Sequence, residues 1–402
     1  MIRILDDMDQ CTGCSACAQV CPRGAIGMME NSEGFLFPET DASSCNDCGL
    51  CRRTCPVART TATSEVEAAS AALPPVFACI ARDPDVRRAS SSGGAYSVFA
   101  ASVLARGGAV FGAAFDESFR VVHRSAASAS GLDALRRSKY VQSDVRDTFR
   151  EVRDLLVAER PVLYCGEPCQ IAGLKAFLGR PYPMLLTCDF VCSGVPSPLV
   201  WRRYLAELSE RHGAKITSIS FRNKSRGWYG YHMSIGFESG SAYEVKAKKE
   251  TFFIGFGKNI FNRKCCADCR FRTRHSAADL TLADYWGIWM TGRPEYRDDQ
   301  GVSLVVAHTQ AGRAALDGAA RDMRIEERTY AEAEASNPRM TSSCPMSPGR
   351  QAFFADLASG MPFGAIRRKW MDNESLAYHL RCLVKAVVPT GLIKGMRSRF
   401  GR

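Results

Sequence analysis

The stretch MDQCTGCSACAQVCPRGAI, residues 8–26, decides how the start of the chain folds, because it packs four cysteines into one short loop and follows the last with a proline. These are Cys11, Cys14, Cys17 and Cys21. The same spacing, C-x2-C-x2-C-x3-C-P, returns as Cys45, Cys48, Cys51 and Cys55 before Pro56. The internal repeat predicts two sites of one chemistry in a single small module.

This spacing is similar to that of bacterial two-cluster ferredoxins, in which each run gives three thiolates to one [4Fe-4S] cube and its fourth cysteine to the other cube. The resemblance implies the ligand sets Cys11, Cys14, Cys17, Cys55 and Cys45, Cys48, Cys51, Cys21. Gly13 and Gly49 are expected to relax the backbone of the two loops. Zinc is the alternative, since paired C-x2-C units also build zinc ribbons, but two complete runs that end in proline fit cubanes better. We expect an α+β ferredoxin module with two [4Fe-4S] clusters over residues 1–58.

The composition of the chain is ordinary for a globular protein of two or three domains, with 402 residues of which 46% are apolar and 24% charged. The first ten residues hold no apolar core of signal-peptide length, and the longest apolar stretch, near 95–105, stops at Arg106, too short to span a membrane. We therefore expect a cytoplasmic protein whose 18 cysteines serve metal or redox chemistry rather than disulfides. The net charge of +11 is not interleaved with aromatic residues in a repeated motif, so nucleic acid is not an expected partner.

After the module, residues 59–75 are rich in Ala, Ser and Thr and end in two prolines, which is typical of a linker. From Val76 onward strand-like runs alternate with helix-like segments. We expect strands near 75–81, 109–115, 161–166 and 184–192 and helices near 93–106, 145–159, 168–178 and 197–211. This alternation predicts an α/β body with a mostly parallel sheet covered by helices. Residues 216–224 and 230–247 predict an antiparallel insertion.

One segment of the body, ASSSGGAYSVFAASVLARGG at 89–108, follows a strand and opens a helix. Ser91 and Ser92 are candidate helix caps, and Gly93 and Gly94 permit a tight turn with close backbone approach. The free N–H groups at a helix start suit a phosphate or pyrophosphate. A simple cap remains the structural alternative, and spacing does not decide between the two.

The remaining cysteines fall mostly at predicted strand ends or just before predicted helices: Cys165, Cys169, Cys188, Cys192, Cys265, Cys266 and Cys269. Because loops of a parallel sheet converge on one edge, these thiols are expected to lie near a single site. Buried free cysteines otherwise behave as small apolar side chains. That is what we expect of Cys79, Cys344 and Cys382.

Eight motifs of the body are long enough to be specific in combination: SSGGAYS (91–97), SKYVQS (138–143), GEPCQIAGLKAFL (166–178), CSGVPSP (192–198), SFRNKSRGW (220–228), CCADCRF (265–271), ADLTLADYWGI (278–288) and GVSLVV (301–306). Together they resemble the beta subunit of coenzyme F420-reducing hydrogenases and dehydrogenases and its bacterial relatives, which include chlorophyllide-type reductases. The resemblance extends to about residue 310. It implies a flavoprotein in which FAD converts between the single electrons of iron-sulfur clusters and the electron pair of an organic carrier or substrate.

The resemblance also implies site residues. The flavin would lie against SSGGAYS and SKYVQS, through Ser91, Ser92, Gly93, Gly94, Lys139 and Tyr140. A third [4Fe-4S] cluster would be held by Cys169, Cys192, Cys266 and Cys269, which leaves Cys165, Cys188 and Cys265 as extra thiols. Residues 76–155 would then form the flavin-binding part of the body, and residues 156–345 the part with the third cluster.

Two departures from the family's pattern bear on the substrate. Where the family usually reads GTPCQ and CHGVP, this chain has Glu167 and Ser193, so a carboxylate and a hydroxyl replace a hydroxyl and an imidazole. The substrate is therefore expected to differ. The chain also carries its own dicluster module, which suits a self-contained reductase fed by a ferredoxin.

These features favour a cytoplasmic iron-sulfur flavoprotein oxidoreductase that passes electrons between [4Fe-4S] clusters and a small two-electron acceptor or donor through FAD. Its expected partner is a redox protein, either a ferredoxin or another oxidoreductase. Two alternatives stay open: a coenzyme F420 oxidoreductase that delivers electrons to a partner, and a non-catalytic electron-transfer subunit. No sequence feature identifies the acceptor.

The C-terminal residues 346–402 are expected to form a basic helical tail. Residues 361–402 contain nine Lys and Arg residues but only two acidic residues, Asp372 and Glu374. Apolar residues such as Leu383, Val387 and Ile393 are mixed among them. A solvated tail is the simplest interpretation, and peripheral contact with an acidic partner or an anionic membrane surface is the alternative.

Overall fold

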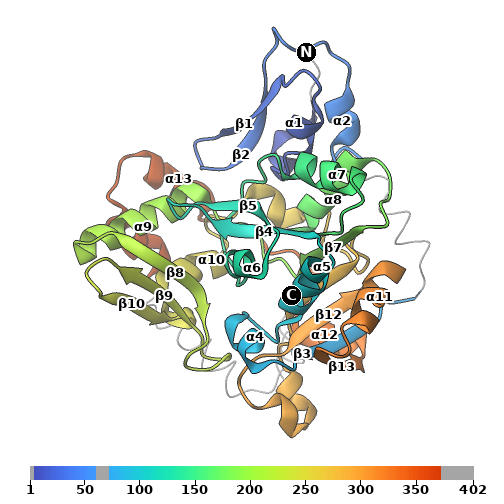
Figure 1. Cartoon of the computed structure of the whole chain (residues 1–402). Helices are drawn as coiled ribbons and strands as arrows, with labels where there is room; N and C mark the ends of the chain where they lie inside the picture. The colour runs from blue at the N-terminus through green and yellow to red at the C-terminus, as the bar shows by residue number, and fades with distance from the viewer. Residues whose placement is uncertain (1–3, 60–71, 373–402) are drawn as a thin grey trace, which may run out of the picture.

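The computed structural model describes residues 4–59 and 72–372. The expected linker is thus largely outside the described residues, as is the tail beyond residue 372. In Figure 1 the N-terminal module, in blue, stands at the top of a larger body built around a sheet. Among the described residues, no helix combines the length and the apolarity that crossing a bilayer requires.

The module contains a 3-10 turn η1 (Met8–Gln10), helices α1 (Ala16–Val20) and α2 (Leu50–Thr54), and an antiparallel hairpin of β1 (Ile26–Glu30) and β2 (Leu36–Thr40). The sequence repeat is also a backbone repeat. Gly13 and Asp47 occupy matching positions with φ of 71° and 58°, and Ser15 and Gly49 have φ of 64° and 73°. The expected α+β module, with relaxed loops at Gly13 and Gly49, is confirmed.

The body is built on an eight-stranded sheet in the order β13-β3-β12-β11-β7-β6-β4-β5. The strands are β3 (Val76–Ala81), β4 (Ala109–Phe115), β5 (Val121–Ala126), β6 (Val162–Cys165), β7 (Leu185–Phe190), β11 (Leu280–Asp284), β12 (Ser303–Ala307) and β13 (Met323–Arg328). The α/β body is confirmed, but its sheet is mixed. Only the central strands β4, β6, β7 and β11 are parallel.

The antiparallel pairs have a local cause. β5 follows β4 through a tight turn in which Asp116 accepts hydrogen bonds from Ser118 and Arg120, so it returns as a hairpin. β11 and β12 are joined without an α-helix, through the 3-10 turns η4 (Ile288–Thr291) and η5 (Pro294–Tyr296). A parallel pair needs a crossover, usually an α-helix, that returns the chain to the same end of the sheet, and neither of these connections contains an α-helix.

Helices cover both faces of the sheet. On one face lie α5 (Ala95–Ala105), α6 (Ala129–Leu135) and α11 (Gln310–Gly318), and on the other α7 (Thr148–Val157) and α8 (Pro168–Leu178). Alternate residues of β4 supply the two cores, with Val110 in the first and Phe111 in the second. Because both faces are buried, these strands are apolar throughout. The short helix α4 (Pro84–Ala89) was not expected from the sequence.

A second sheet, the expected antiparallel insertion, contains β8 (Ile216–Asn223), β9 (His232–Phe237) and β10 (Ala242–Lys246). Its neighbours are α9 (Pro198–His212), α10 (Thr251–Gly257), α13 (Arg350–Ala358), α14 (Phe363–Ile366) and the π-helical turn η7 (Arg367–Met371). Shorter elements are η2 (Ala247–Lys249), η3 (Lys264–Asp268), α12 (Tyr330–Ser336) and η6 (Pro338–Met340).

Two expected boundaries need correction. Residues 350–371 are helical, but Phe353, Ile366 and Met371 are buried in the core of the second sheet, so this segment belongs to the body rather than to a tail. The charge of Arg367 is neutralised there by Glu207 and Asp372. The boundary at residues 155 and 156 falls inside α7, and both sides contribute strands to one sheet, so it separates no structural domains.

Candidate redox centres and cofactor cavity

Two small cavities lie inside the N-terminal module, and each is lined by one of the cysteine sets expected from the sequence. Cys11, Cys14, Cys17 and Cys55 surround the first cavity, which we call the proximal set. Cys21, Cys45, Cys48 and Cys51 surround the second, which we call the distal set. In each set the fourth cysteine comes from the other copy of the repeat. The folded chain therefore makes the crossed arrangement that the spacing suggested.

The chemistry of these sets fits iron-sulfur cubes. Burial, together with the smaller effects of the neighbouring thiols Cys11 and Cys55, raises the pKa of Cys14 to about 12. Buried thiols ionise when they bind metal ions, because the ligands of an all-cysteine cube are four thiolates. Within the described residues no three His, Cys, Asp or Glu side chains converge on a single-ion site. Each set instead encloses a volume.

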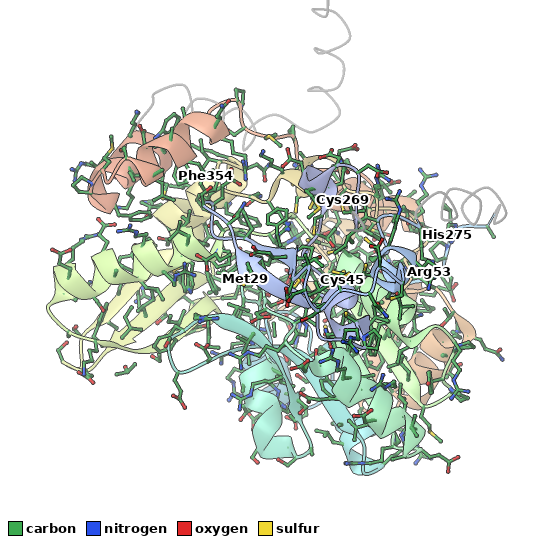
Figure 2. All side chains as sticks on the ribbon, turned by 90° about the horizontal axis from the view of Figure 1, so that it is seen from above. Met29, Cys45, Arg53, Cys269, His275 and Phe354 are labelled. Carbon is green, nitrogen blue, oxygen red and sulfur yellow. The ribbon has the colours of Figure 1, made fainter. Side chains whose placement is uncertain are left out.

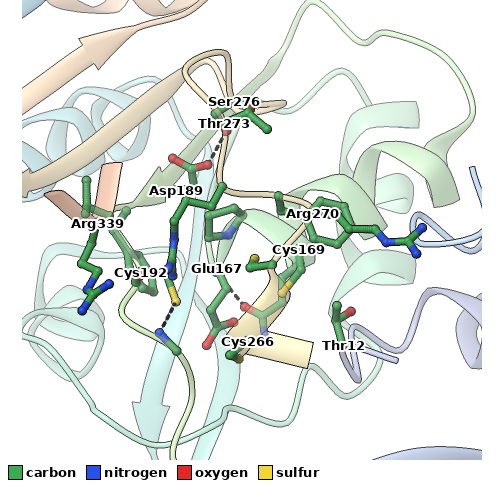
Figure 3. Close-up of a pocket in the computed structure, with 18 of the residues that line it drawn as sticks. Thr12, Glu167, Cys169, Asp189, Cys192, Cys266, Arg270, Thr273, Ser276 and Arg339 are labelled. Atoms are coloured by element: carbon green, nitrogen blue, oxygen red, sulfur yellow. Dashed lines mark hydrogen bonds between the residues drawn. The ribbon is translucent and has the colours of Figure 1, made fainter. Parts of the chain in front are cut away.

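The third set of cysteines comes together from three separate loops of the body. Cys169 lies in the first turn of α8, Cys192 follows β7, and Cys266 and Cys269 lie in and just after η3. All four line one cavity of about 70 Å³, shown in Figure 3. The parallel strands deliver the first two thiols to this edge because β6 and β7 both end there.

The four thiols form a ring of mutual electrostatic neighbours. Cys169 is close enough to Cys269 and Cys192 for each to raise its pKa, after the larger effect of burial. Cys192 and Cys269 are likewise affected by Cys266, after burial. This arrangement matches the set implied by the family resemblance, and we call it the third set.

The extra cysteines have different surroundings. Cys265 lines the same cavity, and a hydrogen bond between its side chain and that of Cys266 is the largest cause of the raised pKa of Cys266. Cys165 borders a different, larger cavity, whereas Cys188 and Cys79 are fully buried in the core of the main sheet. Cys344 is also buried, as expected, and Cys382 lies outside the described residues.

The proximal set touches the body directly beside the third set. A side chain placed on Gly173 of α8 would have its Cβ 2.9 Å from the Sγ of Cys14, so this glycine lets the module approach. Cys14 also raises the pKa of Cys169, with a smaller effect than burial, Glu167, Cys269 and Cys192. The distal set includes an exposed thiol, Cys48. Figure 2 looks down on the module, with Cys45, Arg53 and Met29 labelled on it.

A larger cavity of about 400 Å³ adjoins the third set. This volume lies within the usual range of roughly 300–1,000 Å³ for ligand sites. Five of the six residues expected at the flavin line it: Ser91, Ser92, Gly94, Lys139 and Tyr140. The two cavities share walls, including Glu167 and Cys192. We call this larger volume the cofactor cavity.

Gly93 does not line the cofactor cavity, and its small size has a different cause. A Cβ on Gly93 would lie 2.3 Å from the carbonyl oxygen of Cys79 and 2.5 Å from the backbone nitrogen of Ser303. The residue is therefore squeezed between β3 and β12. The expectation that Gly93 clears space for a phosphate is replaced by a packing role within the protein.

The other expected flavin residues are held in place by local bonds. The hydroxyl of Ser91 accepts a hydrogen bond of 3.0 Å from the backbone N–H of Ser138. The ammonium of Lys139 donates to the carbonyl oxygens of Ala134 at 2.9 Å and Arg136 at 2.6 Å. Burial lowers the pKa of Lys139 to about 7. A small change in its surroundings thus changes the charge of this side chain.

Several other groups line the cofactor cavity, and most of them were not singled out from the sequence. Cationic side chains are frequent in its wall: Arg136, Arg137, Arg222 and Arg339. Among the described residues the hydroxyl of Tyr96, Nδ1 of His123 and Oε2 of Glu167 are buried without a hydrogen-bond partner. Burial raises the pKa of Glu167 to about 7. These positions are scattered along the chain, and only Glu167 carried a signal, as a departure from the family pattern.

A hydrogen-bonded cluster of polar groups borders the third set on its other side. Asp189 accepts hydrogen bonds from the hydroxyls of Ser276 and Thr281. His308 accepts the backbone N–H of Ser276 at Nδ1, so its Nε2 donates to Thr281 at 2.8 Å. Burial raises the pKa of Asp189 to about 7 and lowers that of His308 to about 4. Figure 3 shows Asp189 and Ser276 beside the cysteines.

The crossed cysteine sets and the mixed α/β body together define an iron-sulfur electron-transfer protein. Comparison with known proteins agrees. Residues 10–58 match the family described as a 4Fe-4S dicluster domain, and residues 159–333 match the family described as the C terminus of the coenzyme F420 hydrogenase/dehydrogenase beta subunit. Residues 159–333 therefore belong to the C-terminal family of the coenzyme F420 hydrogenase/dehydrogenase beta subunit, and they follow a 4Fe-4S dicluster domain at the N-terminal end of the chain.

Two individual proteins show how far the likeness extends. An uncharacterised ferredoxin of Methanocaldococcus jannaschii is 31% identical over 55 residues, which is 14% of this chain and 70% of the ferredoxin. A chain of the F420-reducing [NiFe] hydrogenase complex from Methanosarcina barkeri is 15% identical, with 74% of this chain and 90% of that chain covered and a TM-score of 0.43.

Proposed function

We propose that the chain is a cytoplasmic iron-sulfur flavoprotein oxidoreductase that moves electrons between a protein redox partner and a small two-electron substrate. One observation carries the proposal. The distal set, with its exposed thiol Cys48, is followed by the proximal set, the third set and the cofactor cavity. Such a series of adjacent sites suits electron transfer and has no evident use in a purely structural module.

The cofactor cavity supports FAD as the group at the inner end. Its wall combines the start of α5, with the serines at 91 and 92, and several cations that favour an anionic ligand such as a pyrophosphate. Bound there, FAD would exchange single electrons with iron-sulfur centres and electron pairs with an organic substrate. Tyr140, packed edge-on against Phe221 and Phe253, supplies a rigid aromatic wall.

The substrate is proposed to enter the same cavity near Glu167 and Ser193, the two positions where this chain departs from its family. Oε2 of Glu167 is buried without a hydrogen-bond partner, and a donor group of the substrate would supply one. At the opposite end of the series, the exposed Cys48 marks the side on which a ferredoxin or another oxidoreductase would dock. Space for a substrate in the cofactor cavity favours a catalytic protein over a subunit that only relays electrons.

The family match favours a second candidate, in which the electron-pair carrier is coenzyme F420 itself. In that case reduced F420, added to the flavin-loaded protein without oxygen, bleaches the flavin absorption. A protein of the first kind leaves its flavin oxidised in the same experiment. The rest of the proposal is common to both candidates.

The test is the cofactor content of the full chain after anaerobic reconstitution. Three cubes require about 12 iron atoms per chain, and two require about 8. We expect about 12 with one FAD, and about 8 in a Cys192→Ala variant. Cys79→Ala removes a buried thiol outside every set and serves as the control that keeps all the iron. About 8 iron atoms in the unmodified chain, or no bound FAD, would reject the proposal.

A further inference from the structure

Arg263 lies at the junction of the module and the body and has unusual surroundings. It is 2% exposed. Its guanidinium donates to the carbonyl oxygen of Cys11 at 2.7 Å, to that of Leu36 at 3.0 Å and to the side-chain oxygen of Gln142 at 3.1 Å. It also stacks on the ring of Phe37 at 4.1 Å. Every one of these partners is uncharged.

The other buried arginines of the described residues each form an ion pair with a carboxylate. Arg87 pairs with Asp298, Arg222 with Asp284, and Arg350 with Glu33. Among these four, only Arg263 has no carboxylate within the 4.0 Å of an ion pair. An arginine does not lose its proton inside a protein. Burying its charge without an opposite charge costs several kcal/mol, so a compensating anion is expected nearby.

Two of the cysteine sets lie against Arg263, and each becomes anionic once four thiolates hold a centre. In the proximal set, Nε of Arg263 donates to the backbone carbonyl oxygen of Cys11. Arg263 lines the cavity of the third set, and its carbonyl oxygen accepts the N–H of Cys266 at 3.1 Å.

The module is shaped to receive this cation. A Cβ on Gly13 would lie 2.9 Å from Nη1 of Arg263 and 2.8 Å from Nε2 of Gln142. That Nε2 donates to the carbonyl oxygen of Thr12 at 3.0 Å. The first cysteine loop therefore closes over the guanidinium, and the backbone of residues 11–13 takes part in the contact.

We infer that Arg263 is a fixed cation placed between the proximal and third sets, where it raises the reduction potentials of the centres they hold. The inference rests on the proposed function for the third set, but for the proximal set it needs only the dicluster domain. Reduction adds one electron and no proton to a centre that four thiolates already make anionic. A nearby positive charge stabilises the reduced form more than the oxidised form. Arg263 is thus a positioning and tuning residue that lets adjacent centres accept electrons.

The experiment compares variants of the full-length holoprotein in a dithionite titration followed by electron paramagnetic resonance. Arg263→Gln removes the charge, Arg263→Lys keeps it, and Arg350→Gln removes a buried tie of the module that already has its own carboxylate. We expect Arg263→Gln to disfavour reduction of the proximal centre about tenfold, which is about 59 mV for one electron. The distal centre should change less, and Arg263→Lys and Arg350→Gln should leave the proximal potential near its original value.

Other outcomes are equally decisive. An unchanged proximal potential in Arg263→Gln, or an equal change in Arg263→Lys, would overturn the inference and leave Arg263 a purely structural tie. Where Arg263→Gln fails to retain iron, Gln142→Glu decides, because it sets a carboxylate against the guanidinium and is expected to lower the proximal potential in the same direction. No effect of that variant also overturns the inference. Absence of a third centre in the unmodified chain would instead reject the proposed function, while the proximal result still stands.

Discussion

Replacing Gly13 with alanine tests how the module is seated on the body. Gly13 has φ of 71°, a conformation that costs a residue with a side chain roughly 1–2 kcal/mol. Asp47 adopts φ of 58° at the matching position of the second repeat, so the backbone alone does not demand glycine. The additional reason at Gly13 is contact, because its Cβ would meet Gln142, Arg263 and the carbonyl oxygen of Leu36 at 2.8 to 2.9 Å.

The magnitude follows from separating these two effects. Overpacking of this kind costs about 1–3 kcal/mol beyond the backbone strain. Gly24 of the same module has φ of 61° and nothing within 4 Å of its Cβ, so Gly24→Ala carries the strain alone. The destabilisation caused by Gly13→Ala should therefore exceed that caused by Gly24→Ala by about 1–3 kcal/mol, which is roughly 5- to 150-fold in an equilibrium constant or rate.

The assay is the anaerobic rate at which the holoprotein loses its iron-sulfur absorption in a fixed concentration of guanidinium chloride. We expect Gly13→Ala to bleach faster than Gly24→Ala by the factor above, and Gly24→Ala to bleach faster than the unmodified chain. Equal rates in the two variants would refute the seating of Arg263 and Gln142 against the first cysteine loop.

Three other changes have defined outcomes. The amine of Lys139 has a pKa of about 7 and is mostly charged below that value. The unmodified protein should therefore bind FAD more tightly at about pH 6 than at about pH 8, as followed by flavin fluorescence, and Lys139→Met should abolish this pH dependence. Gly93→Ala should lower the melting temperature of the whole body, with or without FAD, because its Cβ would meet the backbone of β3 and β12. A selective loss of flavin at an unchanged melting temperature would contradict this. Glu33→Gln leaves Arg350 buried beside a neutral group and should destabilise the docked module by about 3–5 kcal/mol in denaturant titrations, and a cost within error of zero would argue against that ion pair.

The sequence predicted the features of the fold and the site that depend on the spacing of residues close together in the chain. The crossed cysteine sets of the module follow from one short repeat, and helix α8 was expected with the bounds it has, because Pro168 and Gly179 mark its ends. The strands near 109–115 and 161–166 were visible because both of their faces are buried. The thiols of the third set span a hundred residues. Their positions near strand ends predicted a common site, and the family resemblance selected these four from the seven candidates.

The features that sequence could not predict depend on distant partners. The role of Gly93 is set by the pairing of β3 with β12, which lies more than two hundred residues further along the chain. Arg263 precedes a cysteine pair, but its partners at Cys11 and Leu36 are equally remote. The basic composition after residue 346 suggested a tail, whereas the aromatic residues within it, such as Phe353, are what bury the segment. In each case tertiary contact decided what composition left open.

The most direct test of an electron path from the module through the third set to the cofactor cavity is rapid mixing of the FAD-loaded holoprotein with a reduced ferredoxin under anaerobic conditions. In the unmodified chain and in Cys79→Ala, the flavin absorption should bleach after the iron-sulfur absorption changes. In Cys169→Ala, which keeps both sets of the module, the iron-sulfur absorption should change as before while bleaching of the flavin slows by at least about tenfold, equivalent to 1.4 kcal/mol in the barrier. Flavin reduction at an unaltered rate in Cys169→Ala, with its ferredoxin centres intact, would contradict the proposed path.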